Sequence, residues 1–282
     1  MVDETQAEVP APGTARKRSP LRMIVLALAV LVALAVLVAL AYAALSLTLY
    51  TSQHKAVYFP ALTRVEASAT DLEIRSGDVV LRGWEVNPGQ RDALVYFGGN
   101  AERVEAWRER FGQWFGDRTV YLVAYRGYGA SDGAPRQEPL LADALAVYDE
   151  VRRRHPDGDI GVVGRSLGTG IAAWVASQRP VRKLALVTPF DSLVEVGQAH
   201  YPWLPVRWLA HERYPAAEYL RNYDGQVLVL RAGHDAIVPA RNTDRLLEAL
   251  PKPAQVVDFP EHGHVDLADD PGYGQALSGF MR

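Results

Sequence analysis

The sequence contains no cysteine, and neither sign of charge is in large excess. Without cysteine there are no disulfides, no thiolate nucleophile and no cysteine-ligated zinc or iron–sulfur site. The 282 residues hold 30 basic and 33 acidic side chains, a formal net charge of −3. Nucleic-acid-binding domains usually carry a basic surplus or stripe, so we expect no nucleic-acid partner. With 49% hydrophobic and 22% charged residues, most of the chain is expected to fold around a buried core.

Charge is also missing from a long stretch near the N-terminus. Residues 23–48 contain no charged side chain and are mostly alanine, valine and leucine. About 20 helical residues suffice to cross the roughly 30 Å hydrocarbon core of a bilayer. We therefore expect a transmembrane helix over 23–48 after a disordered cytoplasmic tail over 1–22. The alternatives are a buried core helix and a cleaved secretory signal, because small residues at Ala39, Ala41 and Ala43 offer cleavage patterns.

Flanking charge predicts the orientation of this helix. Arg16, Lys17, Arg18 and Arg22 precede the apolar run, whereas Lys55 alone follows closely. Positively charged flanks stay on the cytoplasmic side of a membrane. We therefore expect a single-pass protein with a cytoplasmic N-terminus and a large extracytoplasmic part, which in a bacterium is periplasmic.

Strand-like and helix-like segments alternate through residues 60–282, which we expect to form one α/β domain. The strand-like segments are a hairpin over 71–86 and the runs 93–97, 119–125, 159–163, 183–187, 226–230 and 255–259. Helical spacing occurs at 101–115, 140–154, 168–177, 243–250 and the C-terminal end. This alternation predicts a mostly parallel central sheet flanked by helices, with active-site residues at the carboxyl ends of its strands.

The candidate nucleophile is Ser166 in Gly-Arg-Ser-Leu-Gly (164–168), which matches G-x-S-x-G. The motif follows an apolar strand and opens a helix of small residues, the setting of a nucleophile elbow. Ser166 then projects at a helix N-terminus, where free N–H groups favour developing negative charge. A phosphate-binding loop is excluded because its lysine and serine or threonine pair is missing. A strand–helix turn without chemistry is the remaining alternative.

A serine nucleophile needs a base and a carboxylate that orients the base. In folds with a nucleophile elbow, the acid follows the serine in the sequence and the base follows the acid. His264 follows the last predicted strand and is our candidate base, with His262 in reserve. Asp235 follows the preceding strand and is our candidate acid, with Asp191 as its rival.

His262, His264 and Asp266 also form H-x-H-x-D, a spacing found in metal-dependent hydrolases. A metal site needs further ligands nearby, and no histidine follows this segment. We therefore expect no metal and no cofactor, and we assign Asp266 to capping the final helix.

Acyl transfer develops an oxyanion that needs two backbone N–H donors. We expect one from Leu167, the residue after the nucleophile. The second is expected from the loop Gly-Gly-Asn-Ala (98–101), where glycines allow close approach of the backbone, and we choose Asn100. An ordinary turn with Asn100 as a helix cap is an alternative that is compatible with this role.

With these residues assembled, the chain resembles the alpha/beta-hydrolase superfamily. More narrowly, it resembles the membrane-anchored alpha/beta-hydrolase-domain group that includes protein depalmitoylases and bacterial relatives. The stretches that carry the resemblance are YFGGNAE (96–102), YRGYGASDG (125–133), GRSLGTG (164–170), GHDAIVP (233–239) and GHVDL (263–267). It implies the same roles for Ser166, Asp235 and His264. Relatives often have histidine where this chain has Gly98, so a side-chain role of that histidine is lost.

A small cap is expected at about 190–222, where Tyr201, Trp203, Trp208 and Tyr214 cluster. These aromatic residues either pack the cap onto the core, or line an acyl groove or touch lipid. The sequence therefore predicts a membrane-anchored serine hydrolase that cleaves an ester, thioester or lipid-like acyl substrate through an acyl-enzyme. The alternatives are a serine peptidase of the same fold and a non-catalytic hydrolase-like binding protein.

Overall fold

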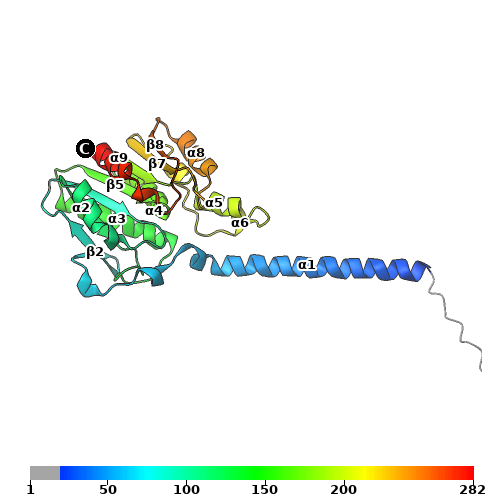
Figure 1. Ribbon diagram of the computed structural model, residues 1–282. Coiled ribbons are helices and arrows are strands. Elements are labelled where there is room, and N and C mark those ends of the chain that lie inside the picture. Colours follow the sequence, from blue (N-terminus) through cyan, green and yellow to red (C-terminus); the bar gives the residue numbers. More distant parts are fainter. Residues whose placement is uncertain (1–19) are drawn as a thin grey trace, which may run out of the picture. The chain divides into compact units, whose positions relative to one another are not determined.

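The structure, a computed structural model, describes residues 20–282 (Figure 1). The predicted tail, with its basic residues Arg16, Lys17 and Arg18, lies outside the described residues except for its last positions. The chain divides into two compact units, Met1–Thr48 and Leu49–Arg282. The site residues predicted from the sequence all belong to the second unit.

Helix α1 (Pro20–Val57) contains 38 residues and is therefore about 57 Å long, so it extends beyond the predicted segment 23–48 at both ends. Pro20 suits the first turn, where a backbone N–H has no helical partner. No side chain of α1 is buried. Among the described residues, α1 is the one helix long and apolar enough to cross a membrane. Its last turns, from Leu49 onward, belong to the second unit.

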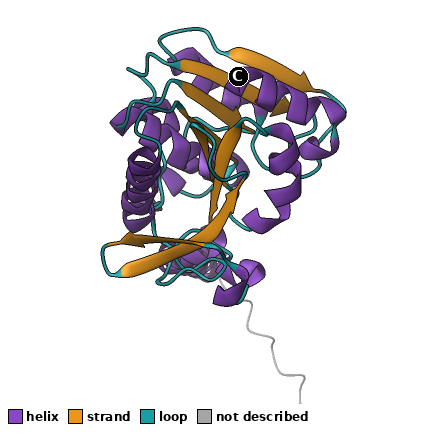
Figure 2. Cartoon of the chain, turned by 90° about the vertical axis from the view of Figure 1, so that its left-hand side faces the viewer, coloured by secondary structure: helices purple, strands orange, loops and turns teal. Residues whose placement is uncertain are grey.

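An eight-stranded sheet forms the centre of the second unit (Figure 2). Its strands are β1 (Leu72–Ser76), β2 (Val79–Val86), β3 (Asp92–Phe97), β4 (Arg118–Val123), β5 (Ile160–Arg165), β6 (Lys183–Val187), β7 (Gln226–Ala232) and β8 (Gln255–Phe259). Their order is β1-β2-β4-β3-β5-β6-β7-β8. Strands β1, β2 and β4 pair antiparallel, and all other pairs are parallel, which confirms the predicted mostly parallel sheet.

The hydrophobic runs of the central strands follow from burial on both faces. Every residue of β4 is buried, as is every residue of β3 after Asp92. A parallel strand covered by helices on both sides has no solvent-facing positions and reads as a continuous apolar run. Strand β1, at the edge, instead alternates between buried and exposed residues, the period of a half-buried strand.

Helices flank both faces of the sheet (Figure 2). They are α2 (Arg108–Trp114), α3 (Gln137–Arg154), α4 (Leu167–Gln178), α5 (Leu193–His200), α6 (Val206–Leu209), α7 (Ala216–Tyr219), α8 (Ala240–Ala249) and α9 (Pro271–Met281). Short 3₁₀ turns add η1 (Pro60–Thr63), η2 (Ala67–Ala69), η3 (Val104–Trp107) and η4 (Leu267–Asp269). Helix α2 packs on α9, whereas α3, α4, α7 and α8 form a connected row. Helices α5, α6 and α7 lie within residues 190–222, the segment that the sequence predicts as a cap and that is called the cap below.

The predicted helix over 101–115 is wrong at its beginning. The chain instead forms η3 over Val104–Trp107 and continues as α2 from Arg108. At the start of the segment, the Glu102 carboxylate accepts a 2.5 Å hydrogen bond from the Gly99 amide, and the Glu102 amide lies 3.3 Å from the Gly99 carbonyl. These contacts close a separate turn over 99–102, and the helical residues begin only after it.

The cap of the final helix is also different from the prediction. Helix α9 is capped by Asp270, whose side chain accepts a 2.7 Å hydrogen bond from the Gly272 amide. Asp266 instead accepts from the Gly263 amide at 2.8 Å, within the loop that precedes η4. Its short side chain therefore shapes the loop of His264 and does not begin the helix.

Sheet order places the candidate site. The chain crosses from β3 to β4 on one side, and then returns past β3 to β5 on the other. Ligand sites of open α/β sheets lie outside the carboxyl ends of strands at such a reversal. The loop after β3 and the turn after β5 leave the sheet side by side there, because Phe97 pairs with Gly164.

Candidate active site

Ser166 lies in a strained turn between β5 and α4. Its backbone adopts φ 51° and ψ −118°, a conformation that residues with a side chain rarely occupy. The Ser166 amide donates to the carbonyl of Val187 at 2.9 Å, and its own carbonyl accepts from Thr169 at 2.9 Å. The neighbouring strand and the first turn of α4 thus hold the conformation that projects the hydroxyl.

The two glycines of the motif are needed for space. A Cβ atom on Gly168 would collide with the carbonyl oxygen of Phe97, and one on Gly164 would collide with the carbonyl oxygen of Gly168. The turn therefore packs backbone against backbone, both within itself and against the end of β3. The two glycines of the G-x-S-x-G pattern therefore have a direct steric basis.

The structure brings Ser166, His264 and Asp235 together. Nε2 of His264 lies 2.8 Å from Oγ of Ser166, and Nδ1 of His264 lies 2.8 Å from Oδ2 of Asp235. The His264 and Asp235 side chains are nearly buried, at 9% and 8% exposure. Oδ1 of Asp235 accepts from the amides of Ile237 and Val238 at 2.9 and 2.7 Å, which fixes the carboxylate. One imidazole thus connects a hydroxyl to an anchored carboxylate.

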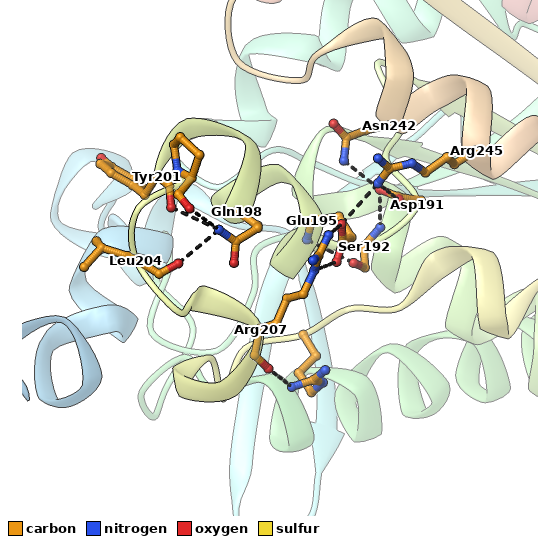
Figure 3. A network of polar contacts seen from close by, with 11 residues as sticks. Asp191, Ser192, Glu195, Gln198, Tyr201, Leu204, Arg207, Asn242 and Arg245 are labelled. Atoms are coloured by element: carbon orange, nitrogen blue, oxygen red, sulfur yellow. Dashed lines mark hydrogen bonds and ion pairs between the residues drawn. The ribbon is translucent and has the colours of Figure 1, made fainter. Parts of the chain in front are cut away.

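The rival acid Asp191 has other partners. It is buried beside the cap, where Oδ1 accepts from Asn242 Nδ2 and from the Ser192 amide, both at 2.8 Å. Arg245 lies 3.3 Å from its other oxygen and 3.1 Å from Glu195 (Figure 3). Asp191 therefore joins α8 to the start of α5 and does not contact His264.

The remaining cap contacts extend the same network (Figure 3). Glu195 also pairs with Arg207 through two contacts of 2.6 and 2.8 Å. Gln198 donates to the carbonyls of Tyr201 and Leu204 at 3.1 and 3.0 Å. These bonds fold α5 and α6 onto each other, so the cap is held by polar contacts as well as by its apolar residues.

The reserve base His262 lies away from Ser166. Its ring faces Asp270, with Nε2 3.2 Å from Oδ2, and Nδ1 lies 3.5 Å from Asp266. His262 and His264 therefore point to different carboxylates. Over the described residues, no group of three or more histidine, aspartate or glutamate side chains is arranged to hold a metal ion.

The two backbone amides chosen for the oxyanion hole border the same cavity. Asn100 and Leu167 line a pocket of about 450 Å³ together with Ser166 and His264. Within the part of the chain that the structure describes, neither amide donates to a protein acceptor. The Gly99 amide, by contrast, is bonded to Glu102. The Tyr128 hydroxyl donates a 2.7 Å hydrogen bond to the carbonyl of Asn100, and this contact helps to hold the loop in place.

A largely buried ion pair supports these loops, and sequence reasoning missed it. Nη1 of Arg165 lies 3.3 Å from Oε2 of Glu102, with 13% and 10% of the side chains exposed. Glu102 also accepts hydrogen bonds from the Tyr96 hydroxyl and the Trp107 indole. Arg165 Nη2 donates to the carbonyls of His264 and Val265 at 3.2 and 3.0 Å. The pair thus links the elbow, the loop after β3 and the histidine loop.

Neighbouring charges and burial shift the pKa of Arg165 in opposite directions. Burial lowers the pKa of Arg165, but the Glu102 carboxylate together with Tyr96 and Tyr273 outweighs this effect, so that the pKa is raised. Burial, with a further contribution from Glu102, raises the pKa of Tyr96. Arg165 therefore stays charged and Tyr96 stays neutral as a donor. Both charged residues lie inside quoted motifs, but no spacing rule indicates that they meet.

The fold and the site geometry define the class, an alpha/beta hydrolase, and comparisons with known proteins agree. A family model described as the alpha/beta hydrolase fold matches residues 92–213. The uncharacterized protein Rv2307c of Mycobacterium tuberculosis is 35% identical over 77% of this chain and 82% of its own. The lysophosphatidylserine lipase ABHD12 of Danio rerio is 29% identical over 43% of this chain and 36% of that protein. The Pyrococcus furiosus esterase Pf2001 superposes with a TM-score of 0.60 at 16% identity, covering 76% and 92% of the chains.

The chain belongs to the alpha/beta-hydrolase superfamily, in its group of alpha/beta-hydrolase-domain proteins. This confirms the resemblance deduced from the motifs at the level of family and fold. The fold and these relatives support a hydrolase with esterase-like neighbours.

Proposed function

We propose that this protein is a serine hydrolase that cleaves acyl esters or thioesters. The observation that carries the proposal is the position of His264, whose ring nitrogens lie 2.8 Å from Ser166 and 2.8 Å from Asp235. A base within hydrogen-bond reach of a hydroxyl, itself oriented by a carboxylate, is the arrangement that activates a serine nucleophile. Ser166 is the proposed nucleophile, His264 the base and Asp235 the orienting acid.

The proposed reaction has two halves. Ser166 Oγ attacks the acyl carbonyl carbon while its proton moves to Nε2 of His264. The carbonyl oxygen becomes negative and is stabilised by the amides of Asn100 and Leu167. His264 gives the proton to the leaving alkoxide or thiolate, and an acyl-enzyme remains. Water then attacks with His264 as base, and the acid and the free Ser166 hydroxyl are released.

Asp235 has a defined part in this sequence. Its carboxylate accepts the Nδ1–H of His264, which leaves Nε2 as the acceptor for the serine proton. It also stabilises the imidazolium formed during the transfer. Because two backbone amides hold its other oxygen, the carboxylate keeps this orientation without help from solvent.

The lining of the pocket favours an acyl group. Besides the polar residues already described, apolar side chains line it: Phe190, Leu193, Val196, Ile237, Val238 and Val265. Such a surface binds hydrocarbon by the hydrophobic effect. The two charged residues that also line the pocket, Glu102 and Arg165, are paired with each other. The names of the relatives, an esterase and a lysophosphatidylserine lipase, agree with ester substrates.

We also propose that α1 anchors the protein in a membrane, with the N-terminus cytoplasmic and the catalytic domain outside. Helix α1 is long and apolar enough to span, and the basic flank precedes it in the sequence. The test is protease protection in intact and permeabilised cells. Cleavage of the hydrolase domain only after permeabilisation of the inner membrane contradicts this orientation.

The proposed activity is tested by the purified full chain in detergent. We expect hydrolysis of p-nitrophenyl acyl esters and acyl thioesters, with slower turnover of aminoacyl amides. Ser166→Ala lowers kcat by about 10⁴-fold or more, as is usual when such a nucleophile is removed. Faster cleavage of the amides favours a peptidase, and turnover equal in the wild type and Ser166→Ala contradicts the proposal.

A further inference from the structure

The C-terminal end of helix α1 is part of the folded hydrolase unit and is joined to the cap. Nε2 of Gln53 donates to the carbonyl of Leu209 at 3.0 Å, and its Oε1 accepts from the His211 amide at 2.6 Å. The ring of Tyr50 lies 4.6 Å from that of His211. The helix thus contacts the cap through one face of its last two turns.

The residues that directly follow the helix are also held by hydrogen bonds. The hydroxyl of Tyr58 donates to Glu212 at 2.6 Å and lies 2.6 Å from the Tyr214 hydroxyl. Tyr58 is buried, and burial together with these partners raises its pKa, so it remains a neutral donor. The Phe59 amide donates to the Tyr128 hydroxyl at 2.9 Å.

This second connection leads to the proposed oxyanion loop. The Tyr128 hydroxyl that accepts from Phe59 also donates to the carbonyl of Asn100. The Phe59 amide itself lies 3.3 Å from the same carbonyl. The segment that follows α1 therefore contacts the cap on one side and the loop of Asn100 on the other.

Two residues of this fixed helix end line the Ser166 pocket. Ala56 and Val57 border it together with Leu193 and Val196 of the cap and Ile237 of the loop after β7. Val57 is half-buried and packs against the core. All of these side chains are apolar, and none of them takes part in the proposed chemistry.

We propose that the end of α1 forms one wall of an acyl-chain subsite, and that Val57 sets the length of chain that this subsite accepts. The inference rests on the proposed acyl hydrolase function. A hydrocarbon chain attached to the carbonyl at Ser166 has to pass along the apolar part of the pocket. Because Gln53 and Tyr58 bond both ends of the wall to the cap, Val57 cannot move aside freely.

Volume at position 57 then discriminates between long and short chains. Val57→Phe fills the subsite and Val57→Ala enlarges it, while neither alters Ser166, His264 or Asp235. A difference of one methylene in an apolar pocket changes kcat/KM by about 10-fold or more. The effect is expected to appear only for acyl chains long enough to reach the wall.

The experiment measures kcat/KM of the full chain in detergent for acetyl, butanoyl, octanoyl and dodecanoyl p-nitrophenyl esters. We expect Val57→Phe to lower the ratio of dodecanoyl to acetyl turnover at least about tenfold. We expect Val57→Ala to raise or keep this ratio. The matched control is Lys55→Phe, which adds the same side chain at an exposed position outside the pocket.

The outcomes distinguish the proposed subsite from the proposed hydrolase function on which it rests. Unchanged chain-length preference in both Val57 variants, with normal acetyl ester turnover, overturns the subsite and leaves the hydrolase function intact. An equal loss of kcat/KM for all four esters in Val57→Phe, with normal labelling of Ser166 by a fluorophosphonate, also overturns the proposed subsite. A wild-type protein that cleaves none of the esters contradicts the proposed function itself, and the subsite with it.

Discussion

The guanidinium of Arg165 lies 3.3 Å from the carboxylate of Glu102. Arg165 directly precedes the candidate nucleophile and Glu102 lies in the loop after β3, so this ion pair connects the two segments. Neither residue contacts the Ser166 hydroxyl. Their partners are backbone groups of the site loops and the aromatic side chains Tyr96 and Trp107. A buried pair with this many partners holds loops in place, and each charge depends on the other for compensation.

Replacement of Arg165 by methionine leaves Glu102 buried without its cationic partner. We expect the free energy of unfolding to fall by about 3 to 5 kcal/mol, the usual cost of breaking a buried pair from one side. Chemical denaturation of the full chain in detergent measures it. The matched control is Arg153→Met, because its pair with Glu150 leaves 72% of Arg153 exposed and is worth about 1 kcal/mol or less. Equal effects of the two variants contradict a bracing role for Arg165.

Asp235→Asn tests the proposed acid. The amide keeps an oxygen for the Ile237 and Val238 amides but favours the wrong tautomer of His264, so we expect kcat to fall about 10⁴-fold. Asp191→Asn is the control, since that carboxylate also follows a central strand but bonds to Asn242 and Arg245. We expect it to lower stability and to retain most of the activity. Ester hydrolysis with the opposite ranking would make Asp191 the acid.

The elbow glycines give a steric prediction. Gly168→Ala places a methyl group against the Phe97 carbonyl, so we expect a loss of about 1 to 3 kcal/mol of stability or more. Gly279→Ala in α9 is the control, because its Cβ meets no atom within 4 Å. There, replacement of a helical glycine is expected to add about 0.5 to 1 kcal/mol. Thermal unfolding of both variants measures these changes in stability. A Gly168→Ala variant as stable as the wild type contradicts the close packing of Gly168 against the Phe97 carbonyl.

Buried tyrosines predict alkaline sensitivity. Burial raises the pKa of Tyr121 from 10.0 to about 12, and burial also raises the pKa of Tyr128. A folded-state pKa above the unfolded value means that the neutral side chain stabilises the fold. This contribution is complete below pH 10 and is lost as the pH rises toward 12.

The measurement is a titration of the folded chain that follows tyrosinate absorbance and circular dichroism together. We expect part of the tyrosinate signal to appear only when the circular dichroism is lost. Full ionisation of the tyrosines near pH 10 with the fold intact is the contrary result.

Gln53 gives a prediction for the helix end. Gln53→Ala removes two hydrogen bonds to the cap backbone, and we expect a loss of about 1 to 2 kcal/mol in stability. Gln113→Ala is the matched control, because its amide makes one exposed 3.5 Å contact with Glu109 and is expected to matter little. Identical unfolding curves for the two variants contradict a structural attachment of α1 to the cap.

The sequence predicted the strands, the helices outside residues 190–222 and the carboxyl-end positions of the candidate residues, because each depends on local pattern. Ser166, Asp235 and His264 each follow a strand whose apolar run is easy to recognise. Their catalytic roles remain predictions, and the structure adds their separations. The start of the helix over 101–115 was wrong because the chain first forms a separate turn over 99–102, closed by contacts between Gly99 and Glu102.

What the sequence did not predict depends on contacts between distant elements. The pairing of Arg165 with Glu102 requires knowledge of where two side chains point from different loops. The part of α1 that lines the pocket falls within residues 49–59, which belong to neither the predicted membrane helix (23–48) nor the predicted domain (60–282). Only the folded arrangement brings Val57 and Ser166 to the lining of one pocket.

The central claim is that Ser166 is an activated nucleophile, and labelling with a fluorophosphonate tests it most directly. The full chain in detergent is treated with the probe, and the modified peptide is identified by mass spectrometry. We predict one adduct, on Ser166, that is lost in Ser166→Ala and is formed far more slowly in His264→Ala. A folded wild-type chain that stays unlabelled, or that is labelled on another serine, contradicts the account.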